Sequence, residues 1–131
     1  IVFRLVRGRI ETYAAGIPDV NGLYASDQAL LIGARRKVLQ LREGKLTEIT
    51  SDFEAGIDGL EMLPDGGYIA PAWVGLIYHV SARGVVTELL DSRSPQMNTA
   101  DIDYDAATHT LYVPTFLANS VRAYALRVSN K

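Results

Sequence analysis

The sequence contains no cysteine, so disulfide bonds and thiolate chemistry are excluded. Long hydrophobic runs are missing as well, and no segment approaches the roughly 20 apolar residues that a membrane-spanning helix requires. Positive charge is not in excess, because the 131 residues carry a formal net charge of −2. We therefore expect neither a membrane nor a nucleic acid as a partner. These features leave the cellular compartment undetermined.

Helical periodicity is also absent, because no stretch keeps apolar residues three and four positions apart. Short runs rich in Val, Ile, Leu and Tyr alternate instead with Gly, Pro, Asp and Asn, which is the pattern of β-strands joined by turns. We predict essentially no helix, and strands over residues 1–6, 9–14, 20–25, 29–34, 37–42, 45–50, 57–62, 67–71, 75–80, 85–90, 100–104, 110–114 and 120–128.

The strands recur as an internal repeat. Asn21-Gly-Leu aligns with Asp58-Gly-Leu 37 residues later, and Asp58 aligns with Asp101 after a further 43 residues. The outer part of the unit repeats too, since Gly44 to Glu48 and Gly84 to Glu88 both end in Thr-Glu. A four-stranded repeat of about 40 residues predicts an all-β fold, a β-propeller built from four-stranded antiparallel blades.

In this interpretation each blade has four strands, which are lettered A to D outward from the axis. Residues 1–14 are strands C and D of one blade, 20–50 and 57–90 are full blades, and 100–128 form a last blade without its outer strand. About three blades cannot close a ring, so we favour the C-terminal part of a longer, six-bladed chain. An N-terminus at Ile1-Val2-Phe3 without an initiator Met fits a processed or truncated chain. Closure by another chain is the alternative.

The topology predicts where functional side chains gather. Residues at the start of each strand A lie on one rim, nearest the axis, so Asn21, Asp58 and Asp101 should converge at the mouth of the channel. The loops between strands B and C place Arg36, Trp73 and Phe116 around them, as a pocket rim for a small-molecule substrate. A plain turn is the alternative for Asn21 and Asp58, because Asn-Gly and Asp-Gly favour hairpin turns.

Several of these phrases resemble a known family. Val20-Asn-Gly-Leu23, Ile57-Asp-Gly-Leu60 and the following Pro64-Asp-Gly-Gly67 are similar to the senescence-marker-protein, gluconolactonase and luciferin-regenerating-enzyme group of six-bladed propellers. The stretches Asn98–Asp101 and Val113–Tyr124 resemble the last blade of a bacterial branch of that group.

The resemblance implies a divalent metal, Ca²⁺ or Zn²⁺, on the propeller axis. The family's Asn and Asp ligands correspond to Asn21 and Asp58, whereas its Glu ligand belongs to a blade that this chain lacks. Asp101 is a third candidate ligand that the family pattern does not include. Oxygen ligands suit a hard cation, and Asp58 is the expected catalytic base that activates water.

The expected function is thus a metal-dependent hydrolase that acts on a sugar lactone or a similar small ester, with this chain carrying part of the site. A non-catalytic propeller that serves as a ligand-binding or protein-interaction scaffold is the alternative, because one fold hosts both. Strictosidine-synthase-like and paraoxonase-like propellers share the fold, but no residue pattern in this chain favours them.

Overall fold

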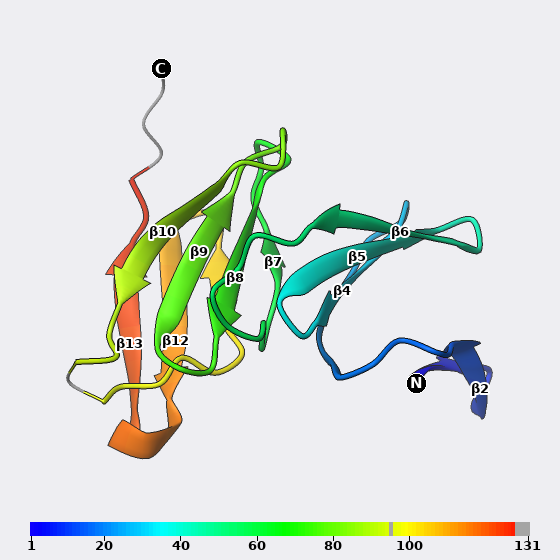
Figure 1. Cartoon of the computed structure of the whole chain (residues 1–131), viewed down its shortest axis with the longest axis horizontal. Helices are drawn as coiled ribbons and strands as arrows, with labels where there is room; N and C mark the ends of the chain where they lie inside the picture. The colour runs from blue at the N-terminus through cyan, green and yellow to red at the C-terminus, as the bar shows by residue number, and fades with distance from the viewer. Residues whose placement is uncertain (95, 128–131) are drawn as a thin grey trace.

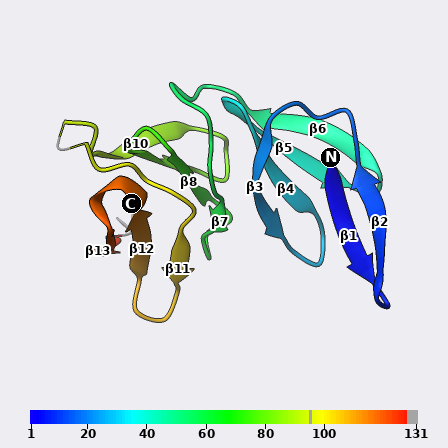
Figure 2. The same cartoon turned by 90° about the horizontal axis from the view of Figure 1, so that it is seen from below.

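The computed structural model describes residues 1–94 and 96–127. These residues form antiparallel β-sheets that fan out side by side (Figures 1 and 2). The first sheet has two strands, β1 (Val2–Val6) and β2 (Arg9–Ala14). The second has four, β3 (Val20–Ala25), β4 (Leu30–Ala34), β5 (Lys37–Arg42) and β6 (Lys45–Thr50).

The remaining strands form two further sheets. The third sheet contains β7 (Glu61–Met62), β8 (Tyr68–Ala72), β9 (Leu76–Val80) and β10 (Val86–Asp91). The last contains β11 (Asp103–Asp105), β12 (Thr110–Thr115) and β13 (Ser120–Ala125). Every sheet is a meander of neighbouring strands, so the prediction of β-propeller blades is confirmed, although the described residues close no ring.

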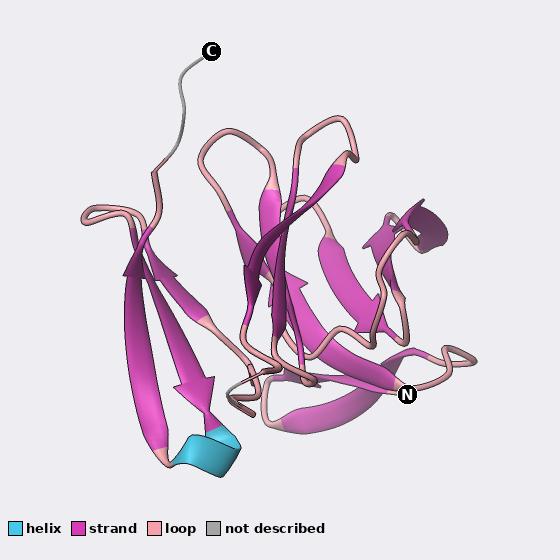
Figure 3. Cartoon of the chain, turned by 60° about the vertical axis from the view of Figure 1, so that its left-hand side comes forward, coloured by secondary structure: helices cyan, strands magenta, loops and turns pink. Residues whose placement is uncertain are grey.

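Helix is nearly absent, as expected. The described residues contain one 3₁₀ turn, η1 (Phe116–Ala118), which connects β12 to β13 (Figure 3). The described residues include no helix with the length and apolar character needed to cross a membrane.

Two innermost strands are shorter than predicted. The strand expected over 57–62 is regular only at β7, with one isolated bridge between Ile57 and Ala72. The strand expected over 100–104 is shifted to β11. In both blades the neighbouring strand carries a proline, Pro71 or Pro114, which has no N–H to donate to the ladder. The strand expected over 120–128 ends at Ala125, and its last predicted residue lies outside the described residues.

Tight turns fix the strand register at the outer hairpins. Arg7 and Gly8 join β1 to β2, and Glu43 and Gly44 join β5 to β6; all four residues have positive φ. Positive φ at both central positions matches the right-handed twist of the flanking strands. The outer strands β2 and β6 therefore begin at equivalent positions.

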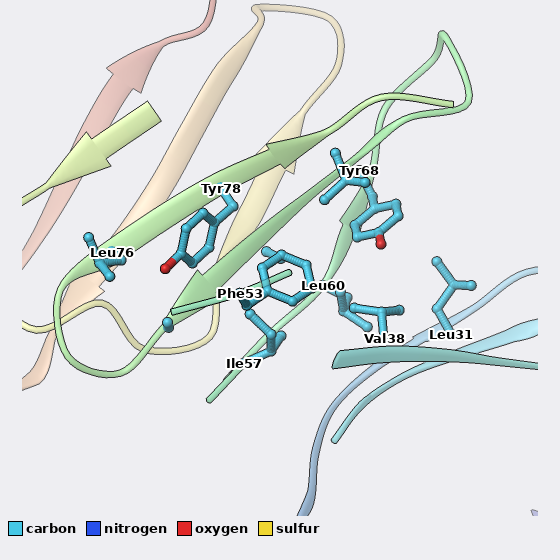
Figure 4. Close-up of a cluster of buried hydrophobic side chains, with 11 residues drawn as sticks. Leu31, Val38, Phe53, Ile57, Leu60, Tyr68, Leu76 and Tyr78 are labelled. Carbon is cyan, nitrogen blue, oxygen red and sulfur yellow. The ribbon is translucent and has the colours of Figure 1, made fainter. Parts of the chain in front are cut away.

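The core lies between sheets. Leu31 and Val38 of the second sheet face Tyr68 and Tyr78 of the third, and Phe53 fills the space between them (Figure 4). Phe53 is fully buried and contacts the Tyr78 ring edge-on, with centroids 5.2 Å apart. Burial of one such aromatic side chain contributes about 1.5–3 kcal/mol, so the blades are held together mainly by apolar packing.

The blades approach most closely at their innermost strands. A Cβ atom built on Gly22 would lie 2.7 Å from Cα of Gly59, closer than any real Cβ contact. The repeated Asn-Gly and Asp-Gly therefore serve as a contact between backbones of adjacent blades, and not as hairpin turns. This contact brings Asn21 next to Asp58.

Replacing Gly22 with Ala should push the second and third sheets apart. Overpacking against a backbone costs about 1–3 kcal/mol, so the midpoint of urea unfolding should fall. Gly56→Ala is the matched control, because its added Cβ would lie 3.5 Å from the carbonyl oxygen of Arg35, an ordinary contact. Equal unfolding midpoints for the two variants would contradict this account of the blade contact.

Candidate functional site

Asn21 and Asp58 lie side by side where two innermost strands meet. Asn21 is in β3, and Asp58 precedes β7. The amide Nδ2 of Asn21 donates a hydrogen bond to Oδ1 of Asp58. The backbone N–H of Asp58 donates to the carbonyl of Pro71 at 2.8 Å, and that of Ile57 donates to the carbonyl of Arg35 at 2.7 Å. Backbone contacts within and between blades thus fix the Asp58 carboxylate beside the amide.

Asp101 comes from the last blade and lies on the other side of Asp58. Its carboxylate packs against Gly59, where a Cβ would overlap it, and its Oδ1 accepts the backbone N–H of Ile102 at 3.0 Å. Burial raises the pKa of Asp58, the charge of Asp101 adds to that rise, and the hydrogen bond from Asn21 opposes it. The structure therefore brings Asn21, Asp58 and Asp101 together from three adjacent blades, and a hydrogen bond joins the first two.

An open pocket of about 410 Å³ lies over the Asn21–Asp58 pair. Arg36 and Trp73 line it together with that pair. The predicted rim residue Phe116 does not line this pocket but packs on Trp73, with ring centroids 5.6 Å apart and the planes tilted by 48°. Both aromatic side chains are exposed, so they form an apolar wall beside a polar floor.

Arg36 is held in place by the chain. Its Nε donates a hydrogen bond of 2.6 Å to the carbonyl oxygen of Phe53. Its neighbour Arg35 also lines the pocket, and Arg35 Nε contacts Oδ2 of Asp19 at 2.5 Å. The sequence analysis did not assign Asp19 or Arg35 to the site. Asp19 immediately precedes β3 and Arg35 immediately follows β4, and this pairing of opposite charges across the two strands is the signal that could have identified them.

Glu61 is another acidic residue that the sequence analysis did not identify. Glu61 begins β7, three positions after Asp58 in the sequence, and it is half-buried. Burial first, and then the charges of Asp103 and Asp101, raise the pKa of Glu61 to about 7. Glu61, Asp101 and Asp103 thus bring further acidic groups close to the Asn21–Asp58 pair.

The side-chain oxygens of the site agree only in part with the ligands that the implied metal needs. Asn21 and Asp58 offer amide and carboxylate oxygens, which are the ligand types of a hard cation. Within residues 1–94 and 96–127, however, no three His, Asp or Glu side chains are arranged to hold a metal ion. The pair fits such a cation in kind and would supply only part of the six to eight oxygen ligands that Ca²⁺ takes.

The raised pKa of Glu61 makes stability depend on pH. Between pH 4.5 and about 7 the unfolded chain releases this proton while the folded chain keeps it, so the free energy of unfolding falls as pH rises. Glu61→Gln cannot ionise and should gain about 1 kcal/mol relative to the natural chain between pH 5 and pH 8, because solvent screens a half-buried group. Urea unfolding at both pH values, with EDTA present, measures this difference.

Glu43→Gln, in the exposed turn between β5 and β6, is the matched control and should show no such pH-dependent gain. A Glu61→Gln chain whose stability parallels that of the natural chain across this range would contradict the assignment.

Comparison with known proteins gives a fold and not a family. No family model matches the chain, and no curated protein matches it. Two computationally designed proteins of known structure are similar at 16% identity, each over 82% of this chain: Ika4 with a TM-score of 0.62 and Ika8 with 0.61. The chain spans 66% of Ika4 and 33% of Ika8.

A natural structure is similar as well. A gluconolactonase from Xanthomonas campestris matches 85% of the chain at 17% identity and a TM-score of 0.66, and the chain spans 40% of its length. Likeness at this level of identity shows a shared propeller-like fold, and the resemblance to the gluconolactonase group goes no further than this distant structural neighbour.

Proposed function

We propose that the chain carries part of the site of a metal-dependent hydrolase that opens a sugar lactone or a similar small ester. The observation that carries the proposal is the Asn21–Asp58 pair on the floor of an open pocket, with Arg36 and Trp73 on its wall. The fold shared with a gluconolactonase supports it.

Asp58 is the proposed catalytic base. Its carboxylate lies on the floor of the pocket, where it can accept a proton from a water molecule bound over the pair. The hydrogen bond from Asn21 keeps one carboxylate oxygen in place and leaves the other for that water. The hydroxide equivalent adds to the lactone carbonyl, the ring C–O bond breaks, and the proton passes to the leaving alkoxide to give a hydroxy acid.

Asn21 and Asp58 would also hold a divalent cation, Ca²⁺ or Zn²⁺, through their side-chain oxygens. When bound, such an ion supplies charge stabilisation for the carbonyl oxygen as it becomes negative. The chain's own contribution is the fixed orientation of these oxygens by the backbone contacts described above. Further ligands would come from the rest of a closed ring, formed by one longer chain or by several chains.

The pocket wall would bind the substrate. Trp73, supported by Phe116, offers an exposed aromatic face on which the apolar side of a sugar ring can pack. The remaining N–H groups of Arg36 can donate hydrogen bonds to substrate hydroxyls, because Phe53 occupies only its Nε. The substrate would thus be held above Asp58.

The open pocket with its aromatic wall also fits the alternative, a non-catalytic binding scaffold. A scaffold would use the same pocket, so the two functions differ only in whether the bound ligand is cleaved.

Replacing Asp58 with Asn tests the proposal. The variant keeps the shape of the side chain but removes the base, so kcat/KM for hydrolysis of glucono-1,5-lactone should fall by about 10²–10⁴-fold. The measurement is a pH-stat assay with Ca²⁺ or Zn²⁺ on the closed propeller ring. Asp27→Asn, in the exposed turn between β3 and β4, is the control and should retain full activity.

Equal activity of the Asp58→Asn and natural proteins would overturn the assignment of the base. Tight binding of a lactone by the natural protein without any hydrolysis under either metal would favour the scaffold instead.

A further inference from the structure

The turns around the pocket mouth change in character from one sheet to the next. The turn between β4 and β5 carries Arg35 and Arg36, whereas the equivalent turn between β8 and β9 carries Trp73 and Val74. The connection between β12 and β13 continues the series with η1, which begins with two more apolar residues and lies at the same, lower end of its sheet in Figure 1. One side of the mouth is therefore cationic and the other is apolar.

The apolar side is exposed. Its four residues, which we call the rim patch, are Trp73, Val74, Phe116 and Leu117, and they are exposed by 42%, 48%, 68% and 65%. Large apolar side chains that gather at one exposed place mark a binding surface, whereas scattered ones do not. The third sheet packs on the second through one buried cluster and on the last through another, so Trp73 and Val74 are exposed although both neighbouring sheets are present.

The rim patch is also held in shape by the chain. Phe116 packs on the Trp73 ring from the adjacent sheet. The backbone N–H of Leu117 donates a hydrogen bond of 2.8 Å to Oδ1 of Asn98, which is buried. The apolar surface is therefore formed before a ligand arrives, and such preorganisation lowers the entropic cost of binding.

This surface begins inside the pocket and continues beyond it. Trp73 and Val74 line the pocket together with Asp58. Phe116 lies outside the lining, on the far side of Trp73. An ester group placed over Asp58 would thus have apolar protein surface beside it that leads out of the pocket. A sugar lactone bears hydroxyl groups on its ring carbons and has no apolar substituent to lay along this surface.

We propose that the substrate of this site is a lactone or ester with an apolar substituent, an alkyl chain or an aryl group, which lies along the rim patch. The polar end of the substrate then faces Arg36 on the cationic side of the mouth. The substituent loses contact with water as it packs, which supplies the binding free energy. This inference rests on the proposed function for the cleaved ester group and narrows its substrate class.

Binding of uncleavable lactams tests the patch without any catalysis. Trp73 is the only tryptophan of the sequence, so its fluorescence reports on this place alone. The full chain is titrated with δ-valerolactam and with the same ring carrying a pentyl group at carbon 6. A fully buried methylene strengthens binding by about fourfold, and about twofold is expected on an open surface, so the pentyl lactam should bind at least about tenfold more tightly.

Two substitutions of exposed residues locate the effect. Phe116→Gln should reduce the preference for the pentyl lactam by at least about threefold, because the substituent loses an aromatic contact, and should leave the affinity for δ-valerolactam unchanged. Val85→Gln is the matched control, since Val85 is equally exposed but lies between β9 and β10, at the opposite end of the third sheet. This variant should keep the full preference.

Three results would overturn the inference. One is equal affinity for the two lactams, or no change in Trp73 fluorescence with either. Another is a closed propeller ring that hydrolyses glucono-1,5-lactone but not δ-decalactone, which would leave the hydrolase proposal intact. The third is displacement of the pentyl lactam by phosphatidylcholine vesicles that shift the Trp73 emission, since the patch would then bind a lipid surface.

Failure of the hydrolase proposal looks different. A closed ring that binds the pentyl lactam with the expected preference but hydrolyses no lactone would contradict the hydrolase and would support the rim patch as the site for an apolar substituent.

Discussion

The close approach of neighbouring innermost strands is the constraint on which the candidate site depends. Gly22 packs on the backbone of Gly59, and Gly59 in turn packs on Asp101. Because neither glycine has a Cβ, adjacent blades meet with backbone against backbone, and the polar residue that precedes each glycine is brought to the same level. The repeated dipeptide therefore has two roles. The glycine allows the short distance between the blades, and at that distance Asn21 can donate a hydrogen bond to Asp58. A propeller that relaxed this contact would keep its fold but would separate the amide from the carboxylate.

The same close packing affects the pKa values of the acidic residues near the Asn21–Asp58 pair. Burial raises the pKa values of Asp58 and Glu61, and the charge of Asp101 adds to both, with that of Asp103 adding to the rise at Glu61. Negative charge concentrated in this way is unfavourable to folding and favourable to a bound cation. Of the two arginines that line the neighbouring pocket, Arg35 pairs with Asp19, and Arg36 donates through Nε to the carbonyl of Phe53. The gathering of acidic groups thus supports the cation site proposed above.

Much of the architecture could be predicted from the sequence, because strand periodicity and the repeat are local signals. Both outer hairpins with Gly8 and Gly44 begin their strands where the pattern placed them. The innermost strand β3 has its predicted bounds, whereas β7 and β11 were predicted less well. Pro71 and Pro114 interrupt the ladder of the strands beside these two, an effect that depends on pairing. For the site, the phase of the repeat brought Asn21 and Asp58 to one place, but Glu61 was missed. Its pKa is raised first by burial and then by the charges of Asp103 and Asp101 in another blade, and neither cause is visible in the local sequence.

The last blade departs from the repeat at two positions. Ile102 stands where the two preceding blades have Gly22 and Gly59, and it is buried among the apolar residues between the last two sheets. Arg122 stands where those blades have the buried Leu39 and Tyr78. An exposed cation at this otherwise apolar position does not contribute to apolar packing as Leu39 and Tyr78 do. The last blade therefore departs from the repeat at both its innermost and its third strand, where each replaced residue changes how that strand can pack.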